Sequence, residues 1–319
     1  MALNHLYFKG VSNIGDSHIT DRLETSLAFF LNWAFLEIGA FYNVEIPTSG
    51  AFGGDFSKLR AVRDPSYTNY KVYEAPRQDF IYETGVAYTG GSPIAITGVS
   101  VNGTIYGTGD ATYGHYVDYP RGRVIFNSPL TSSSVVKLEY SYRQVQVYVA
   151  GDAPWWREAQ FNSMRPDNST FTQLGSGNWM IGSEKRVQMP AIIIESVPTR
   201  SFAGFEVGNG ASLVFQTVNF DILSETKYDR DKLMDIISTQ YFRNTIVFDT
   251  DSINFPLDYR GMLVSTDQYP DFVRPINDNL NRGQKALWRT VQVVDMGMVH
   301  PSLYTARVRV QMEIPYGSI

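Results

Sequence analysis

The chain has 319 residues, of which 43% are hydrophobic and 18% charged, and its formal net charge is −5. This length can bury a core large enough for one large domain or two smaller ones. The absence of cysteine excludes disulfide scaffolds, cysteine-ligated zinc and thiol nucleophiles, and the dispersed basic residues do not form the footprint of a nucleic-acid-binding or anionic-membrane-binding protein.

The first predicted element is a helix that begins near residue 20. Apolar residues recur at helical spacing over residues 23–38, and Thr20 or Asp21 is expected to cap the start. Gly39 is expected to end the helix. The apolar stripe is wide, so the helix should pack on most of its sides, either against the subunit's own core or at a subunit interface.

The N-terminal region shows no sign of membrane insertion or secretion. Residues 1–10 lack the apolar core of a signal peptide. The most apolar run, residues 27–41, contains Asn32 and Glu37 and is too short to span a bilayer. We therefore expect a soluble chain that is made in the cytosol and has no membrane partner.

Residues 76–150 predict a run of short strands separated by turn sequences. Between residues 116 and 130, two strands are expected around a turn at Pro120–Gly122, because proline presets one backbone angle and glycine accepts angles that other residues resist. A polar turn at Thr131–Ser134 leads to a third strand, and Asn102-Gly103 suits a tight hairpin. This spacing indicates an inserted β-sandwich-like module.

The parity of the apolar residues changes at Arg143 and Gln144. Apolar side chains occupy even positions before this point and odd positions after it: Val136, Leu138, Tyr140 and Tyr142, then Val145, Val147 and Val149. Such a switch requires a bulge or a crossing between two sheets. We therefore expect the β-module to end near this point, and we divide the chain into residues 1–75, 76–150 and 151–319.

Residues 151–185 appear irregular and carry three tryptophans, Trp155, Trp156 and Trp179. A loop of this length is more often functional or ordered by a partner than idle. Exposed tryptophans would anchor an interface, whereas the alternative is that they fold back onto their own domain.

The C-terminal part predicts an α+β domain with a helix on a mainly antiparallel sheet, and the N-terminal helix is expected to pack with it. The expected order is two strands, a helix and three strands, at residues 191–197, 214–222, 229–242, 245–249, 288–294 and 304–314. The last strand alternates strictly between apolar and polar residues. Arg307 and Arg309 lie on its polar face, where they could line a channel, pair with acidic neighbours or be solvated.

No catalytic, cofactor-binding or metal-binding residue is predicted. The four histidines, His5, His18, His115 and His300, are not paired at metal-ligand spacing. Gly107-Thr108-Gly109-Asp110 lacks the lysine of a phosphate-binding loop, and Gly175-Ser176-Gly177 lacks the register of a nucleophile elbow. A glycosidase needs only two well-placed carboxylates, so this enzyme class stays open.

Three parts of the sequence resemble proteins of tailed bacteriophages. The text Asp118-Tyr119-Pro120-Arg121-Gly122-Arg123-Val124-Ile125-Phe126 resembles a β-module of their virion proteins. The Asp229-Arg230-Asp231-Lys232-Leu233 helix between strands is similar in layout to tail-completion and tail-terminator proteins, and the opening helix resembles those of neck proteins.

The resemblance implies a non-enzymatic virion structural protein that forms a homo-oligomeric ring in the neck, between the portal-bearing head and the tail. A hexamer is the first expectation and a dodecamer the second. The implied partners are other neck proteins, a portal-side connector and tail tube or sheath proteins, and genomic DNA could pass through without specific binding. Assembly would take place in the host cytoplasm, without cofactors.

Two other functions stay open beside the ring. The twenty tyrosines and nineteen phenylalanines favour assembly, because tyrosine packs its ring while its hydroxyl stays hydrogen-bonded. A carbohydrate-binding or collar or tail-fibre attachment protein would use the β-module, with Tyr116 and Tyr119 as contacts. A polysaccharide-degrading enzyme would need paired acids facing a cleft. In the ring, the β-module is expected to project outward while the flanking parts build the ring.

Overall fold

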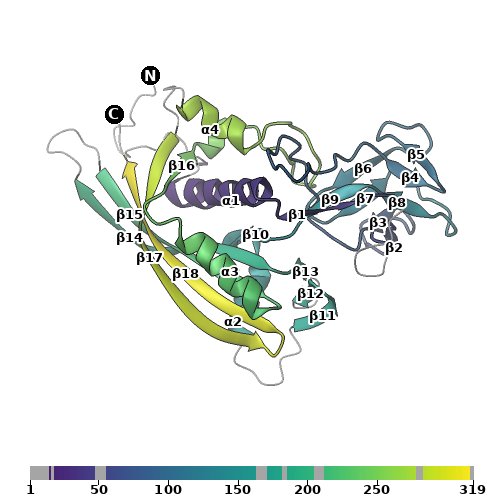
Figure 1. The fold of residues 1–319 in the computed structure, drawn as a ribbon. Helices are drawn as coiled ribbons and strands as arrows, with labels where there is room; N and C mark the ends of the chain where they lie inside the picture. The colour runs from purple at the N-terminus through teal and green to yellow at the C-terminus, as the bar shows by residue number, and fades with distance from the viewer. Residues whose placement is uncertain are drawn as a thin grey trace. The chain divides into compact units, whose positions relative to one another are not determined.

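The computed structural model describes residues 14–15, 18–46, 55–162, 171–181, 185–204, 212–277 and 283–316. The fold is α+β, as the sequence predicts, with a curled C-terminal sheet (Figure 1). Contacts divide the chain into two compact units. Unit 1 comprises Met1–Asn32, Gln146–Ile253 and Tyr269–Ile319, and unit 2 comprises Trp33–Val145 and Asn254–Gln268.

The described helical segments are α1 (Ile19–Glu37), η1 (Ala150–Asp152), α2 (Pro154–Asn162), α3 (Lys227–Ser238), η2 (Thr250–Ser252) and α4 (Tyr269–Asn277), where η marks a 3-10 turn. The strands are β1 (Phe41–Val44), β2 (Arg60–Val62), β3 (Val72–Glu74), β4 (Val99–Val101), β5 (Thr104–Tyr106), β6 (His115–Asp118), β7 (Arg123–Phe126), β8 (Val136–Leu138), β9 (Tyr140–Arg143), β10 (Gln146–Val149), β11 (Phe171–Gly175), β12 (Asn178–Ile181), β13 (Lys185–Gln188), β14 (Ala191–Gly204), β15 (Ser212–Ser224), β16 (Asn244–Phe248), β17 (Gly283–His300) and β18 (Leu303–Tyr316).

Unit 1 is built on a six-stranded sheet in the order β10-β14-β15-β18-β17-β16. All neighbours are antiparallel except β10 and β14, so the expected mainly antiparallel sheet is confirmed. The sheet curls strongly, and α3 packs on β15 and β18 (Figure 1). The alternation of the last strand is confirmed from residue 306 onward by its buried residues, Ala306, Val308, Val310, Met312 and Ile314, whereas Thr305 on the other face is also buried.

The start of α1 differs from the prediction. The amide of Arg22 donates to the carbonyl of His18 over 3.0 Å, so helical hydrogen bonding begins before the two expected caps. Thr20 and Asp21 therefore lie inside the first turn of α1 and do not cap it. Both are polar residues suited to a helix start, and the sequence pattern placed that start two or three residues too late.

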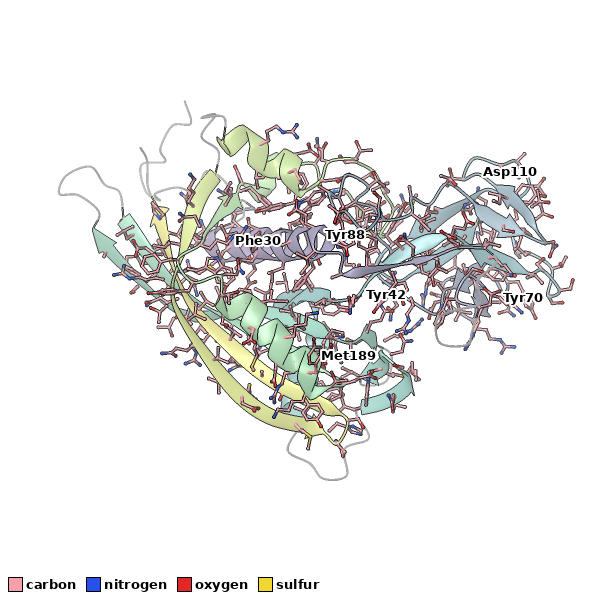
Figure 2. All side chains as sticks on the ribbon, in the orientation of Figure 1. Phe30, Tyr42, Tyr70, Tyr88, Asp110 and Met189 are labelled. Atoms are coloured by element: carbon pink, nitrogen blue, oxygen red, sulfur yellow. The ribbon has the colours of Figure 1, made fainter. Side chains whose placement is uncertain are left out.

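The end of α1 agrees with the prediction. Gly39 takes a positive φ of 80°, and the amide of Ala40 donates to the carbonyl of Phe35 over 2.9 Å, which is the hydrogen bond of a Schellman cap. In unit 1, the apolar side of the helix is buried in the chain's own core, where Figure 2 labels Phe30. The guanidinium of Arg243 lies 4.7 Å from the ring centroid of Phe30. Among the described residues, no helix has both the length and the apolar character that crossing a membrane requires.

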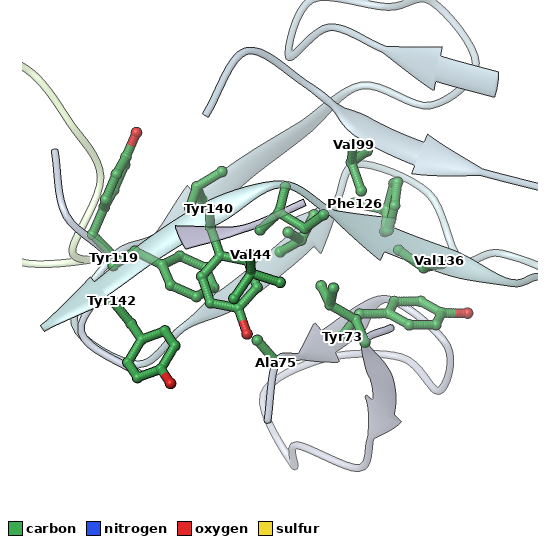
Figure 3. Packing of buried hydrophobic residues seen from close by; sticks show 14 of the residues in the cluster. Val44, Tyr73, Ala75, Val99, Tyr119, Phe126, Val136, Tyr140 and Tyr142 are labelled. Carbon is green, nitrogen blue, oxygen red and sulfur yellow. The ribbon is translucent and has the colours of Figure 1, made fainter. Parts of the chain in front are cut away.

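Unit 2 consists of small sheets that share one core. A four-stranded sheet in the order β2-β3-β7-β6 and a three-stranded sheet in the order β5-β4-β8 both contribute to it, together with the pair β1-β9. Figure 3 shows side chains from these sheets meeting, among them Tyr73, Val99, Phe126 and Val136. The rings of Tyr73 and Phe126 pack edge to face, with centroids 5.6 Å apart. Side chains of two sheets thus fill one interior, as in a sandwich.

The predicted turns of this unit are all present. Asn102 and Gly103 both have positive φ, 51° and 92°, and join β4 to β5 as a tight hairpin. Gly122 has a φ of 62° between β6 and β7, and a Cβ there would lie 2.5 Å from the carbonyl oxygen of Arg77. The amide of Ser134 donates to Thr131, 3.1 Å away.

The chain crosses between sheets where the apolar parity changes. β9 pairs with β1 in unit 2, whereas β10 pairs with β14 in the sheet of unit 1. The contact boundary lies between Val145 and Gln146. Of the two explanations for the parity switch, the crossing between sheets is therefore confirmed. Unit 2 is also larger than the expected module of residues 76–150, because it includes residues from Trp33 onward and the later segment Asn254–Gln268.

Two segments that looked irregular contain regular structure. Within residues 151–185, the described residues form α2 and the strands β11 and β12, and β13 begins at Lys185. The stretch between the expected strands at residues 245–249 and 288–294, for which no element was predicted, contains α4. Pro270 lies in the first turn of α4, where a missing amide hydrogen leaves no helical hydrogen bond unmade.

The helix expected over residues 229–242 is α3, which is shifted toward the N-terminus. The hydroxyl of Thr226 accepts from the amide of Asp229 over 3.0 Å and caps the start. Phe242 lies beyond the end of α3 with a positive φ of 62°, so it is not part of the helix's inner face. The apolar periodicity identified the helix, but the cap residue determined its first turn.

Candidate interaction surface

The three predicted interface tryptophans are buried in unit 1. Trp155, Trp156 and Trp179 belong to one apolar cluster, together with residues of β14 such as Ile193. Trp179 is fully buried. The expectation that they anchor an interface as exposed residues is wrong for this structure, because they fold back onto their own domain. The cause is the β11–β12–β13 meander, which the sequence pattern did not show and which carries Trp179 inward.

Glu225 holds this meander to the end of β15. Its carboxylate accepts from the indole nitrogen of Trp179 over 2.7 Å, from the amide of Gly177 over 2.8 Å and from Gln173 over 3.0 Å. The indole also meets the ring of His300 edge-on, with centroids 5.2 Å apart. Sequence reasoning missed Glu225, because a carboxylate between a strand and a helix gives no signal that distinguishes it from a solvated residue.

The two predicted contact tyrosines of unit 2 differ in exposure. Tyr119 is buried, and its burial raises the pKa of its hydroxyl. Its amide donates to the carbonyl of Gly261 over 3.0 Å. Tyr116 is half-buried, and its hydroxyl lies 2.8 Å from that of Tyr67. Tyr119 is therefore part of the core of unit 2, and of the two tyrosines only Tyr116 is partly accessible to a partner.

A third tyrosine, which the sequence reasoning did not select, is far more exposed. Tyr259 has 93% of its surface accessible, and the guanidinium of Arg260 lies 5.4 Å from its ring centroid. Asp258 orders this loop by accepting from the amides of Arg260 and Met262, both over 2.9 Å. A stacked tyrosine and arginine on an ordered loop form a recognisable contact surface.

The two predicted arginines of the last strand have different surroundings. Arg307 donates to both carboxylate oxygens of Asp221, over 2.7 and 2.9 Å, and the side chain of Asp221 is only 1% exposed. Burial raises the pKa of Asp221, while the hydrogen bonds and charge of Arg307 oppose the rise. Arg309 is exposed and reaches Asn219 over 3.3 Å. Arg307 thus pairs with an acidic residue of its own chain.

The largest cluster of exposed apolar side chains on one strand lies on β17. Val293, Val294, Met296 and Met298 are each 48–55% exposed, although β17 is 18 residues long and belongs to the main sheet. β16 pairs only with residues 283–287 of β17, so the following part has β18 on one side and no described strand on the other. We name residues 289–298 the β17 edge.

A second uncovered stretch lies at the opposite side of the same sheet. β10 pairs only with residues 191–194 of β14, and no described strand covers residues 197–204, which we name the β14 edge. Phe202 is 59% exposed there. Pro198 also lies in this stretch, and proline within sheets is confined to positions where no ladder hydrogen bond is required. Of the devices that usually protect a sheet edge from pairing, the β14 edge carries Pro198 and a register shift between Ser196 and Arg200, and the β17 edge carries a register shift between Asp295 and Gly297; neither edge strand is short.

Several ionisable side chains of unit 2 are buried or partly buried and contact one another in its interior. In unit 2, the guanidinium of Arg143 donates to both oxygens of Glu83, over 2.6 and 2.7 Å, and lies 3.2 Å from Asp79. Burial raises the pKa of Asp79 to about 6, with Glu83 adding to the rise and Arg143 opposing it. Burial also lowers the pKa of His115, whose Nδ1 contacts the carbonyl of Tyr113 over 2.9 Å.

No metal site is visible in the part of the chain that the structure describes, where no three histidine, aspartate or glutamate side chains gather. The candidate surfaces for function are the two edges of the unit 1 sheet and the Tyr259 loop of unit 2. Comparison of the chain with protein-family models, with curated proteins and with solved structures gave no match.

Proposed function

We propose that this protein is a non-enzymatic structural component of a tailed-phage virion, a ring in the neck that joins the portal-bearing head to the tail. It would act as a connector, tail terminator or adaptor, assembled in the host cytoplasm. The phage assignment rests on the resemblance of residues 118–126 and of the helix at residues 229–233 to such proteins.

One observation supports assembly above the others, namely the exposed apolar β17 edge. The half-exposed valine and methionine side chains that follow one another along β17 form apolar surface that a monomer usually buries. Methionine is enriched at protein interfaces because its flexible side chain adapts to a partner. Closed rings use two different faces of each subunit, and the sheet of unit 1 has two uncovered edges.

The test is the mass and shape of the purified protein. We expect native mass spectrometry and negative-stain images to show closed rings, hexamers first and dodecamers second, alone or with connector and tail proteins from the same virus. Particles that stay monomeric in the presence of those partners would contradict the proposal. Detection of the chain in purified virions, at a copy number that matches the ring, would add independent support.

The Tyr259 loop favours a second candidate, a carbohydrate-binding or collar attachment surface on unit 2. Tyr259 is almost fully exposed, and the guanidinium of Arg260 lies 5.4 Å from its ring centroid. Sugars stack on exposed aromatic rings and accept hydrogen bonds from nearby guanidinium groups. Glycan-array binding by the wild type that is lost in Tyr259→Ala, and kept in the control Tyr241→Ala, would support it. Absence of binding would remove it.

A further inference from the structure

The two uncovered edges of the unit 1 sheet lie at diagonally opposite corners. One row of paired residues runs Ala191, Leu223, Thr305 and Gly297 across the sheet, and at this level β10 covers β14 while β17 is bare. A second row runs Ser201, Phe215, Glu313 and Leu287. At that level β16 covers β17 and β14 is bare.

The directions of the two edge strands suit each other. β14 is antiparallel to β15, β15 to β18, and β18 to β17, so β14 and β17 of one copy run in opposite directions. Copies related by a rotation about a ring axis all point the same way along that axis. The β17 edge of one copy therefore meets the β14 edge of the next in antiparallel orientation, which continues the pattern of the sheet.

The diagonal placement also fits a closed ring. Joining the edges requires the next copy to be displaced along the strand direction, so that the bare part of β14 reaches the bare part of β17. In a sheet that closes on itself, tilted strands supply this displacement as the shear of the barrel. The curl of the unit 1 sheet is compatible with such a closed arrangement (Figure 1).

We propose that the β17 edge of one copy pairs with the β14 edge of the next copy, so that the unit 1 sheets form one continuous sheet around the ring. This inference rests on the proposed ring and names the surfaces that build it. Backbone hydrogen bonds between the edges supply the pairing, and burial of Val294, Met296 and Phe202 supplies apolar contact.

Pairing of two β17 edges about a two-fold axis is the main competitor. It would bury the same valines and methionines, but it would leave the β14 edge with Phe202 uncovered, and it would stop at a dimer. The presence of two bare edges of comparable length and opposite direction favours the head-to-tail arrangement.

The test uses one blocked edge at a time. We expect the double variant Val294→Lys and Met296→Lys, and separately the variant Phe202→Lys, to be monomeric at concentrations where the wild type forms rings, with association at least about 100-fold weaker, because each would place an unpaired charge in a buried interface. The matched control is Ile105→Lys on β5 of unit 2, which is 61% exposed and should keep the ring. Circular dichroism melting checks that each variant is folded.

Mixing the two edge variants separates the competing arrangements. Each keeps one intact edge of the opposite kind, so an equimolar mixture should give a one-to-one dimer that cannot close into a ring. If the Phe202→Lys variant alone dimerises, the two-fold arrangement is correct and the proposal is overturned.

A second measurement uses the wild type alone, in case an edge variant fails to fold. Hydrogen exchange should slow at the amides of both edges in the assembled form relative to a diluted, monomeric sample, while β5 is unchanged. Rings whose edge amides exchange as fast as in the monomer, or that survive both blocked edges, would overturn the edge pairing and leave the ring proposal standing. A wild type that never assembles with its partners would instead contradict the proposed function itself.

Discussion

Unit 1 and unit 2 differ in the length of their strands and in how these strands pair with neighbours. Unit 2 divides short strands of three or four residues among small sheets that close around one aromatic core. The main sheet of unit 1 contains four strands of 13 to 18 residues, β14, β15, β17 and β18, and parts of β14 and β17 extend beyond the short strands β10 and β16 that pair with them. In the second arrangement, two long stretches of edge strand have no described neighbour.

The comparison teaches where to look for an assembly surface. The sequence drew attention to tryptophans, which are the usual anchors of interfaces, but in unit 1 they fill the core. The exposed apolar residues of the β17 edge are valines and methionines, which look ordinary in the sequence. Unpaired backbone beside apolar side chains is the observation on which the proposed ring rests. If each unit is stabilised by its own interior, a substitution in that interior should lower the stability of that unit.

The largest effect is expected from Trp179→Ala in unit 1. The change removes a fully buried indole and leaves Glu225 without a main hydrogen-bond donor, so the free energy of unfolding should fall by about 4 kcal/mol. Urea unfolding followed by hydrogen exchange would locate the loss in unit 1. The control Trp179→Phe keeps most of the packing and should lose clearly less. Equal losses for both variants would show that the indole hydrogen bond matters more than its volume.

A somewhat smaller loss, about 3 kcal/mol, is expected in unit 2 from Arg143→Met, because Glu83 would stay buried without its partner. The same measurement should place this loss in unit 2. The double variant Arg143→Met with Glu83→Gln removes the stranded charge and should recover part of the stability. If the double variant is no more stable than the single one, the guanidinium acts by packing rather than by charge.

The two arginines of β18 allow a matched comparison within unit 1. Arg307→Ala leaves the buried Asp221 unpaired and should cost about 2 kcal/mol, whereas Arg309→Ala at an exposed site should stay within about 0.5 kcal/mol. Thermal unfolding of both variants measures the difference. Comparable losses would mean that Arg309 has a partner in the assembled protein that the single chain lacks.

The smallest effect concerns pH and Asp79 in unit 2. In the folded unit, the carboxyl has a pKa of about 6, and in the unfolded chain it has a pKa near 3.8, so the folded state binds more protons between these values. Its contribution to stability is therefore present at low pH and is lost as pH rises through 6. Because the side chain is 28% exposed, we expect a loss of about 1–2 kcal/mol between pH 4 and 7.

The measurement is the difference in unfolding free energy between the wild type and Asp79→Asn across this pH range, since the variant lacks the titrating group. Other carboxylates contribute equally to both proteins and cancel. A difference that is constant or that rises with pH would show that the charge of Arg143 outweighs the burial of Asp79.

Features that depend on a few neighbouring residues could be predicted from the sequence. The helix end at Gly39, the hairpin at Asn102-Gly103, the parity switch near Arg143 and the alternation of β18 all follow from local backbone geometry and side-chain periodicity. The order of strands around α3 was also predictable, because each element carries its own apolar pattern.

Features that depend on distant residues could not be predicted. α2 is short and its tryptophans are buried by β14 and the meander, so its own pattern does not show which side faces inward. The carboxylate of Glu225 gains its role only from Trp179, which lies 46 residues earlier. The candidate surface was missed for the same reason, because an edge is defined by where the neighbouring strands end, and single-chain periodicity contains no information about that.

The contact between Gly261 and the turn at Tyr119 has a consequence for the order of biosynthesis. The carbonyl of Gly261 accepts from the amide of Tyr119, yet the segment Asn254–Gln268 is translated only after residues 146–253 of unit 1. Chains emerge from the ribosome with the N-terminus first. A nascent chain that ends at Val145 therefore contains every strand of unit 2 but not the loop that covers its turn. Translation of unit 2 begins after the first segment of unit 1, Met1–Asn32, and is completed only after Gln146–Ile253 of unit 1 has been made.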